Sequence, residues 1–307
     1  MNQPAVKLEH VTKQIGRKTI IKDLTFDIYS GEVFGFLGPN GAGKTTTIRM
    51  IVGLMKISQG NIFIHGKSIK TEFKQAIKHI GAIVENPEMY KYLSGYNNLV
   101  HYARMINGVS KERIDEVVKL VGLSDRIHDK VKRYSLGMRQ RLGLAQALLH
   151  SPDVLILDEP TNGLDPAGIR EMRQHIRKLA QEEGIAVIVS SHLLSEMELM
   201  CDRIGIIQKG KLIGVQTVNE FIHSDTNQQV QFYVDKPKKS SQVIIDSLSL
   251  SNVIQGDTYI ELSIIKEQIP LVCEALIKAD IKLYNIKTLE KTLEEKFLEV
   301  TGGVSVG

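Results

Sequence analysis

The sequence predicts an α/β fold in which parallel strands form a buried sheet. Two short apolar segments, residues 33–37 and 154–157, have the composition of strands that are covered on both faces. A third apolar segment, 185–189, follows a charged segment of helical length, 168–183, as a βαβ crossover requires. Polar residues follow the strands at 154–157 and 185–189, and ligand sites in such folds lie at the carboxyl ends of the strands.

The chain before the first buried strand also predicts strands. Val6, Leu8 and His10 alternate with polar neighbours, and residues 25–28 repeat the pattern. A glycine-rich turn follows the strand at 33–37, and the segment 45–54 after it has helical character. The order strand, glycine-rich turn, helix makes this turn a candidate binding loop.

The middle of the chain is predicted to be mostly helical. Residues 98–105, 112–121 and 135–149 carry apolar side chains at helical spacing. We therefore expect a helical subdomain of about residues 88–150 within a domain of residues 1–220.

A change of composition near residue 220 predicts a second domain. The segment 223–229 is polar, and alternating segments follow at 230–234 and 259–262. Residues 267–279 and 289–300 have helical patterns, the last with an apolar stripe from Leu289 to Val300. We predict a small C-terminal α+β appendage over 221–307, and we interpret the lysine-rich segment 236–240 as a solvated turn.

The amino-acid composition and net charge of the chain exclude several classes of protein. Hydrophobic residues make up 42% of the 307 residues and charged residues 24%, which is ordinary globular usage. The net charge of +4 is small for this length, so we expect no nucleic-acid partner. Cys201 and Cys273 lack metal-ligand spacing and suit a reducing compartment. We expect neither a secretory signal after Met1 nor a membrane span, although the protein can still dock on a membrane.

The strongest motif is the glycine-rich turn, which matches the phosphate-binding pattern G-x-x-x-x-G-K-[ST]. Glycines allow successive backbone N–H groups to point inward at phosphate oxygens, and the helix that follows adds its positive dipole end. Lys44 is expected to reach the β- and γ-phosphates of ATP, and the Thr45 hydroxyl to ligate Mg²⁺. A chance glycine-rich turn is disfavoured by the strand before it and the helix after it. The predicted ATP-binding residues are Gly38, Pro39, Asn40, Gly41, Ala42, Gly43, Lys44, Thr45 and Thr46.

Two carboxylates end the apolar strand at 154–157. We expect Asp158 to hold Mg²⁺ through water, and Glu159 to orient or deprotonate the attacking water. A strand that ends in Asp-Glu is common, but after a phosphate-binding loop it indicates nucleotide hydrolysis.

Two further features carry both a structural and a functional interpretation. Ser135 stands where it can cap the helix that follows, and the same position can present a hydroxyl and N–H groups to an anion. His192 follows the strand at 185–189, where it can sense the γ-phosphate and position water, although a lone histidine is usually structural.

In this order, these four features resemble the nucleotide-binding subunit of ATP-binding cassette (ABC) transporters over roughly residues 5–215. The resemblance implies a P-loop NTPase fold, with a RecA-like core and a helical subdomain. It also implies that two copies pair head to tail and enclose two ATP molecules. Ser135 and Gly137 of one copy then contact the ATP on the other copy, and the loop of Asp165 joins the two sites. Glu159 matches the family's catalytic base and His192 its switch histidine.

The sequence departs from the family pattern at three places. The signature motif is Tyr-Ser-Leu-Gly-Met (134–138), which keeps Ser135 and Gly137. Glu85 stands where the family has a glutamine that contacts Mg²⁺; its carboxylate can still ligate the metal, but it adds charge near the γ-phosphate. Ile15 stands where an aromatic residue stacks on adenine, so an apolar contact replaces stacking.

These departures resemble the bacitracin and lantibiotic exporters of Gram-positive bacteria, which similarly show Ile-Val-Glu, Ser-Leu-Gly-Met and a C-terminal appendage. The resemblance implies an ATPase subunit at the cytoplasmic face of the membrane. There it would energise a separate transmembrane permease that exports antimicrobial peptides.

Two other classes of protein share some of these features. A soluble P-loop ATPase that acts on DNA or ribosomes shares the signature, but such chains usually insert a long coiled coil or carry two cassettes. Glu85 suggests instead a regulatory module that binds the nucleotide but does not hydrolyse it. The retention of Lys44, Asp158, Glu159 and His192 argues against that module.

Overall fold

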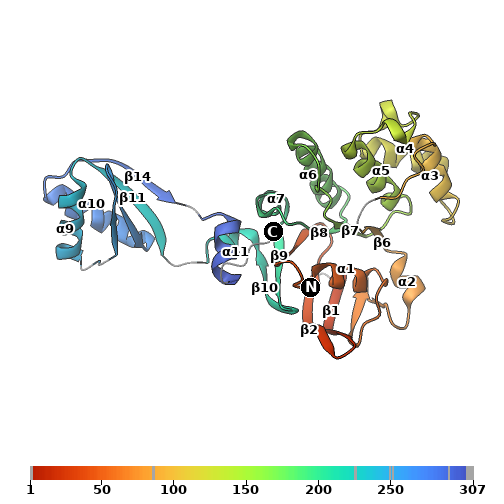
Figure 1. The fold of residues 1–307 in the computed structure, drawn as a ribbon, viewed down its shortest axis with the longest axis horizontal. Helices are drawn as coiled ribbons and strands as arrows, with labels where there is room; N and C mark the ends of the chain where they lie inside the picture. Colours follow the sequence, from red (N-terminus) through yellow and green to blue (C-terminus); the bar gives the residue numbers. More distant parts are fainter. Residues whose placement is uncertain are drawn as a thin grey trace. The chain divides into compact units, whose positions relative to one another are not determined.

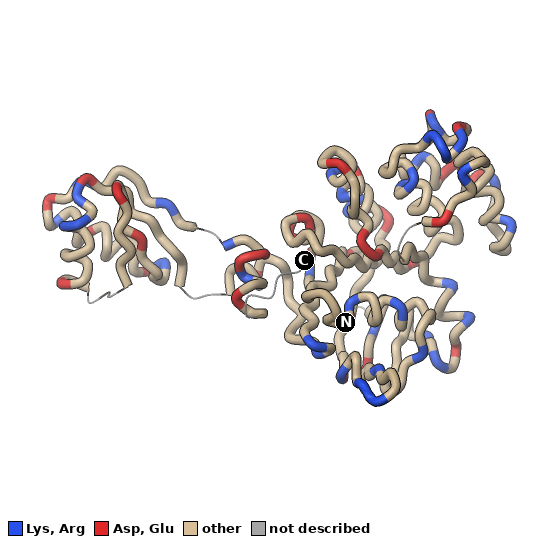
Figure 2. The backbone as a smooth tube through the Cα atoms, in the orientation of Figure 1, with Lys and Arg blue, Asp and Glu red and all other residues tan. Residues whose placement is uncertain are grey.

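The computed structural model describes residues 3–84, 87–224, 227–248, 250, 252–289 and 291–301 (Figure 1). The chain divides into two compact units. The first ends at Val218 and also includes Thr301, and the second is Asn219–Val300. Acidic and basic residues lie interspersed along both units (Figure 2). Among the described residues, no helix combines the length and apolar character that a membrane span needs.

A six-stranded sheet, ordered β10-β9-β3-β8-β7-β6, forms the centre of the first unit. The strands β3 (Val33–Leu37), β6 (Ile80–Ile83), β7 (Val154–Asp158), β8 (Ala186–Ser190) and β9 (Arg203–Gln208) are parallel. The edge strand β10 (Lys211–Thr217) is antiparallel to β9. Every residue of β3, β7 and β8 is buried, which confirms the three predicted parallel strands.

A second, antiparallel sheet has the order β2-β1-β4-β5. Its strands are β1 (Val6–Ile15), β2 (Lys18–Ile28), β4 (Gln59–Ile64) and β5 (Lys67–Ser68). Phe26 of β2 and the β3 residues Phe34 and Phe36 form a cluster with ring centroids 5.3–5.6 Å apart. One continuous apolar core thus includes residues of both sheets and of helix α1 (Lys44–Ile51), which follows the glycine-rich turn.

Three helices predicted from the middle of the chain are present as α3 (Gly95–Ala103), α4 (Lys111–Leu120) and α5 (Leu136–Leu148). Two 3₁₀ turns, Ser124–Arg126 and Val131–Arg133, lie between α4 and α5. The short helix α2 (Phe73–Ile77) precedes β6 and contacts β4 and β5 instead. Each of α3, α4 and α5 begins after a serine, Ser94, Ser110 or Ser135, whose hydroxyl accepts a hydrogen bond from a backbone N–H of the first turn. These caps fix the starts of the helices.

Two more helices border the central sheet. Helix α6 (Pro166–Gln181) connects β7 to β8, as predicted for the crossover, and begins at a proline, which suits the first turn of a helix. Helix α7 (Leu194–Met200) lies between β8 and β9.

The second unit has a four-stranded antiparallel sheet ordered β12-β13-β11-β14. Its main elements follow in the order β11 (Gln228–Val234), α9 (Pro237–Leu248), β12 (Val253–Gln255), β13 (Tyr259–Ile264), α10 (Ile269–Lys278) and β14 (Leu283–Leu289). This β-α-β-β-α-β order is the ferredoxin-like arrangement. Helices α8 (Val218–Ile222) and α11 (Leu293–Thr301) and a 3₁₀ turn, Lys266–Gln268, complete the set.

The lysine-rich segment is not the turn that the sequence suggested. Helix α9 begins there, at Pro237. The ammonium groups of Lys236 and Lys239 donate hydrogen bonds to the carbonyls of Asp280 and Ala279, at 3.4 and 2.7 Å. These carbonyls lie just beyond the end of α10, where carbonyls lack helical partners and the helix dipole is negative, so the lysines stabilise that end.

The helix predicted over 289–300 begins later than expected. Leu289 ends strand β14, and α11 starts at Leu293. The predicted apolar stripe holds in part, because Leu293 and Phe297 are fully buried whereas Val300 is 40% exposed.

Candidate nucleotide site

The glycine-rich turn connects the buried end of β3 to the first turn of α1. Gly43 has φ +116°, and a Cβ at this position would lie 2.4 Å from Cδ1 of Ile21. Only glycine tolerates both the backbone angle and the close approach. The Ala42 N–H donates to the Pro39 carbonyl at 3.0 Å, and the Ala42 carbonyl accepts from the Gly210 N–H at 2.9 Å. The loop is therefore held in place from its own side and from the turn between β9 and β10.

Lys44 is the first residue of α1 and is half-buried. Its ammonium donates to the Gly38 carbonyl at 2.5 Å, across the base of the loop. Burial lowers the pKa of Lys44, and the negative charges of Glu159 and Asp158 act in the opposite direction. A partly desolvated cation at the first turn of a helix is a favourable place for a phosphate.

The tip of the loop is more exposed to solvent than the residues that follow it on α1. Asn40 and Gly41 at its tip are exposed, whereas Thr45 and Thr46 on the first turn of α1 are half-buried. The hydroxyl of Thr47 donates to the Gly43 carbonyl at 3.0 Å and so supports the turn from within. The open tip leaves room for a nucleotide to approach.

The two carboxylates lie at the end of β7. Asp158 is 8% exposed, and Glu159 has φ +54°, a left-handed conformation that is uncommon for a residue with a side chain. The Glu159 N–H donates to the carbonyl and to the hydroxyl of Ser190 on β8, at 3.1 and 3.2 Å. The Ser190 hydroxyl in turn donates to Oδ1 of Asp158.

The sequence motif at the end of this strand is Ser190-Ser191-His192, and the sequence assigns a role to His192 alone. In the structure, Ser190 sits opposite Asp158 in the register of β7 and β8. A polar residue that ends a wholly apolar strand was the signal that could have found it. That signal depends on knowing that β8 is the neighbour of β7.

His192 follows β8 and completes the group. Its Nδ1 lies 2.7 Å from Oε2 of Glu159. Because a carboxylate only accepts hydrogen bonds, Nδ1 carries the proton in this contact. The structure thus brings together Asp158, Glu159 and His192, all of which the sequence predicted as site residues.

The predicted signature residues lie elsewhere in the first unit. Ser135 caps α5 and accepts from the Met138 N–H at 3.2 Å. Helix α5 lies with α3 and α4, apart from α1 (Figure 1). A Cβ on Gly137 would lie 3.8 Å from Leu164, so the signature packs against the loop before α6 in its own chain.

The remaining predicted residues vary in what the structure shows. Asp165 caps α6, and its Oδ1 accepts from the Gly168 N–H at 3.1 Å. Ile15 lies at the end of β1 and is 52% exposed. Glu85 lies outside the described residues, so the structure does not place this predicted metal ligand.

The available side chains fit a magnesium–triphosphate complex. The buried Asp158 carboxylate and the Thr45 hydroxyl are hard oxygen donors, which Mg²⁺ prefers, and Lys44 supplies a partly desolvated cation for the phosphates. Across the part of the chain that the structure describes, no group of three or more His, Cys, Asp or Glu could hold a metal. Mg²⁺ is commonly held by one or two carboxylates together with phosphate oxygens, so such a protein cage is not required.

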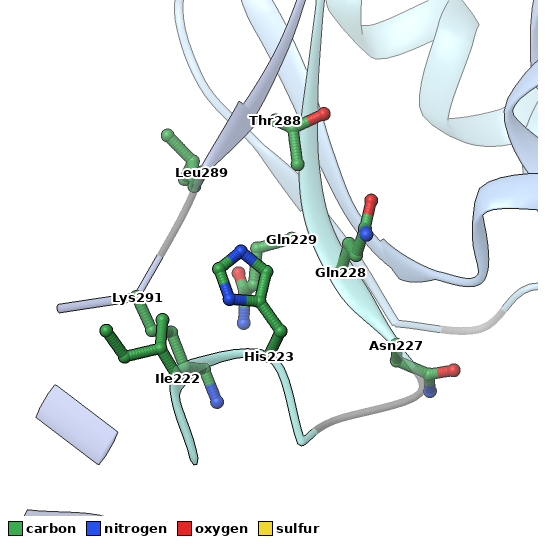
Figure 3. A pocket seen from close by; sticks show the side chains of 8 residues that line it. All are labelled: Ile222, His223, Asn227, Gln228, Gln229, Thr288, Leu289 and Lys291. Atoms are coloured by element: carbon green, nitrogen blue, oxygen red, sulfur yellow. The ribbon is translucent and has the colours of Figure 1, made fainter. Parts of the chain in front are cut away.

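A separate cavity of about 80 Å³ lies in the second unit. His223, Gln229 and Lys291 are among the residues that line it (Figure 3). The Lys291 ammonium lies 2.6 Å from the Glu299 carboxylate, so its charge is already paired. We assign no ligand to this cavity.

Comparison with known proteins agrees with the class of protein that the fold and the site define. The ABC transporter family matches residues 21–162. The ABC transporter ATP-binding protein YhcH of Bacillus subtilis, itself uncharacterized, is 62% identical over 97% of this chain and 96% of its own length. The chain therefore belongs to the ATP-binding proteins of ABC transporters.

Other relatives and a solved structure carry more specific descriptions. The bacitracin transport ATP-binding protein BcrA of Bacillus licheniformis is 38% identical over 98% of this chain and 99% of its own length. The lantibiotic transport ATP-binding protein SrtF of Streptococcus pyogenes is 42% identical over 68% of this chain and 89% of its own length. The structure of cbiO1 from Clostridium perfringens, part of the ABC transporter complex cbiONQ, has a TM-score of 0.66 and 25% identity, and covers 80% of this chain and 96% of that one.

These findings confirm the predicted P-loop NTPase fold and the predicted resemblance to bacitracin and lantibiotic exporters. The chain is an ATP-binding subunit of an ABC transporter, and it hydrolyses ATP to power transport. Subunits of this family form dimers and pair with membrane permeases.

Proposed function

We propose that this ATPase drives the export of antimicrobial peptides of the bacitracin and lantibiotic type, and so provides resistance or self-immunity. It would act at the cytoplasmic face of the membrane and energise a separate permease. The observation that carries the proposal is that the similarity to the bacitracin transport protein extends over both units, at 98% of this chain. A match confined to the ATPase unit would support the ATPase alone.

The geometry supports a role for each residue around the phosphates. The loop N–H groups and Lys44 bind the β- and γ-phosphates. Bound Mg²⁺ would neutralise charge on these phosphates, with Thr45, Asp158 and Glu85 as the residues that hold it. Glu159 orients or deprotonates the water that attacks the γ-phosphate. His192, 2.7 Å from the Glu159 carboxylate, holds this base and responds to the γ-phosphate.

The working unit in this proposal is a head-to-tail dimer. Ser135 and Gly137 begin α5, a helix of 13 residues whose first N–H groups can bind an anion. Because α5 lies apart from α1 in the same chain, these residues would bind the ATP that sits on a second copy. Asp165, in the loop that packs against the signature, would join the two sites. Ile15, which is 52% exposed, would supply an apolar contact for adenine.

Peptide export can be tested in a bacitracin-sensitive strain. The chain is expressed together with its permease partner, and growth inhibition by bacitracin and by lantibiotics is measured against a matched strain that carries Glu159→Gln. Resistance that depends on an intact Glu159 supports the proposal. Equal sensitivity of both strains to every peptide contradicts it, as does the failure of a membrane pull-down to recover a multi-span partner. ATPase activity stimulated by DNA or ribosomes would favour the rival class of soluble P-loop ATPase.

A further inference from the structure

We propose that Ser190 is a positioning residue that fixes the Asp158 carboxylate for Mg²⁺ and thereby sets how much Mg²⁺ strengthens ATP binding. The inference rests on the proposed role of Asp158 as the residue that holds Mg²⁺. It adds a residue of β8 to a metal site whose described ligands are Thr45, on the first turn of α1, and Asp158, at the end of β7.

Ser190 is an exception in its surroundings. Strand β8 is otherwise apolar, from Ala186 to Val189, and all five of its residues are buried. Ser190 is 1% exposed. A buried hydroxyl without a hydrogen-bond partner destabilises the fold, so a serine at the end of such a strand calls for a specific contact.

The contacts of Ser190 are directed at the two carboxylate residues. Its hydroxyl donates to Oδ1 of Asp158 and accepts from the Glu159 N–H at 3.2 Å. Its carbonyl accepts from the same N–H at 3.1 Å. One residue thus fixes the direction of the Asp158 carboxylate and also supports the left-handed backbone at Glu159.

The neighbouring serine shows that burial alone does not produce these contacts. Ser191 is fully buried, and its hydroxyl accepts from the Leu193 N–H at 3.0 Å, a local turn contact. His192, the next residue, contacts the Glu159 carboxylate. The end of β8 therefore holds the two acids separately: Ser190 holds the carboxylate of Asp158, and His192 holds that of Glu159.

Removal of the Ser190 hydroxyl should affect the side chain of Asp158 more than the backbone. In Ser190→Ala the carbonyl that accepts from the Glu159 N–H remains, so the strand end keeps its main-chain contact. The Asp158 carboxylate loses the hydrogen bond from this hydroxyl, which contributes to its orientation. Loss of a residue that orients a metal ligand typically weakens metal binding roughly 10- to 100-fold.

The test measures the dissociation constant of mant-AMP-PNP, a fluorescent non-hydrolysable ATP analogue, in Mg²⁺ and in EDTA. The constant in EDTA divided by the constant in Mg²⁺ reports how much Mg²⁺ strengthens binding. For Ser190→Ala we expect this ratio to fall on the order of tenfold or to near one, with the constant in EDTA unchanged. Ser190→Cys keeps a weak donor of similar size, so its ratio should lie between those of the wild type and Ser190→Ala.

A matched control comes from the second unit. Ser240 is also fully buried, and its hydroxyl donates to the Lys236 carbonyl at 2.8 Å, so Ser240→Ala removes a comparable hydrogen bond and should leave the ratio unchanged. A wild-type ratio in Ser190→Ala overturns the proposal. Equal weakening of binding in Mg²⁺ and in EDTA also overturns it, because that result shows a general structural role. If Asp158→Asn keeps the wild-type ratio, the proposed role of Asp158 itself fails.

Discussion

Gly43 offers a direct test of how the phosphate-binding loop is built. Its φ of +116° is sparsely populated for residues with a side chain, and an added Cβ would lie 2.4 Å from Cδ1 of Ile21. Gly43→Ala therefore introduces backbone strain of about 1–3 kcal/mol. The overpacking against Ile21, which is fully buried, adds about 1–3 kcal/mol. The expected total, about 2–6 kcal/mol, is a large part of the roughly 5–15 kcal/mol by which domains are stable.

A second substitution can separate the cost of overpacking against Ile21 from the cost of backbone strain. The next nearest atom to the added Cβ is Cγ1 of Ile21, at 3.8 Å, which is an ordinary contact distance. Ile21→Val removes Cδ1 and costs about 0.5–1.5 kcal/mol by itself. In the double variant this substitution should recover about 1–3 kcal/mol, a coupling that a double-mutant cycle measures.

The assay is urea unfolding followed by circular dichroism, fitted with one transition for each unit if the units unfold separately. Gly41→Ala is the control, because Gly41 has φ +74° and an added Cβ meets no atom within 4 Å. It should cost only the left-handed strain of about 1–2 kcal/mol. A coupling energy near zero between positions 43 and 21 would refute the steric argument.

Three further predictions concern other parts of the chain. Glu159→Gln should still bind ATP but hydrolyse it roughly 10²- to 10⁴-fold more slowly. Size-exclusion chromatography should then show a dimer with ATP and a monomer with ADP; turnover at the normal rate would rule out Glu159 as the base. Burial raises the pKa of both thiols, and far more for Cys201, so iodoacetamide at mildly alkaline pH should label Cys273 first, as mass spectrometry can show. Equal labelling of Cys201 and Cys273 in the folded protein would contradict the deeper burial of Cys201. Phe232→Ala, in the core of the second unit, should destabilise that unit by about 3–5 kcal/mol and leave ATP hydrolysis intact. Loss of ATP binding in this variant would show that the units depend on each other.

The elements that the sequence predicted best are those with the strongest burial. Strands β3, β7 and β8 are buried along their whole length, and this burial appears directly as unbroken apolar runs. Strand β14 was not predicted, because it is an edge strand with five exposed residues between half-buried ends and shows no alternation. Helix α9 was missed because Pro237 and the lysines around it resemble a turn, and their contacts with the end of α10 depend on tertiary structure.

In the candidate site, the residues of local motifs were predictable, whereas contacts set by the order of the strands were not. Lys44, Asp158 and His192 belong to local motifs whose spacing along the chain carries the information. Ser190 belongs to the same local motif as His192, but its contact with Asp158 depends on the pairing of β7 with β8. Strand order is decided by packing across the whole sheet, so a local reading of the sequence could not supply it.

The left-handed backbone at Glu159 has a consequence for how this protein can change. Glycine adopts this conformation without the penalty that a side chain brings, so Glu159→Gly would relieve strain while it removes the carboxylate. Selection for a more stable chain, without a requirement for turnover, would therefore favour the loss of glutamate at this position. A glutamate at this left-handed position therefore supplies the carboxylate at a cost in stability that glycine would not bring.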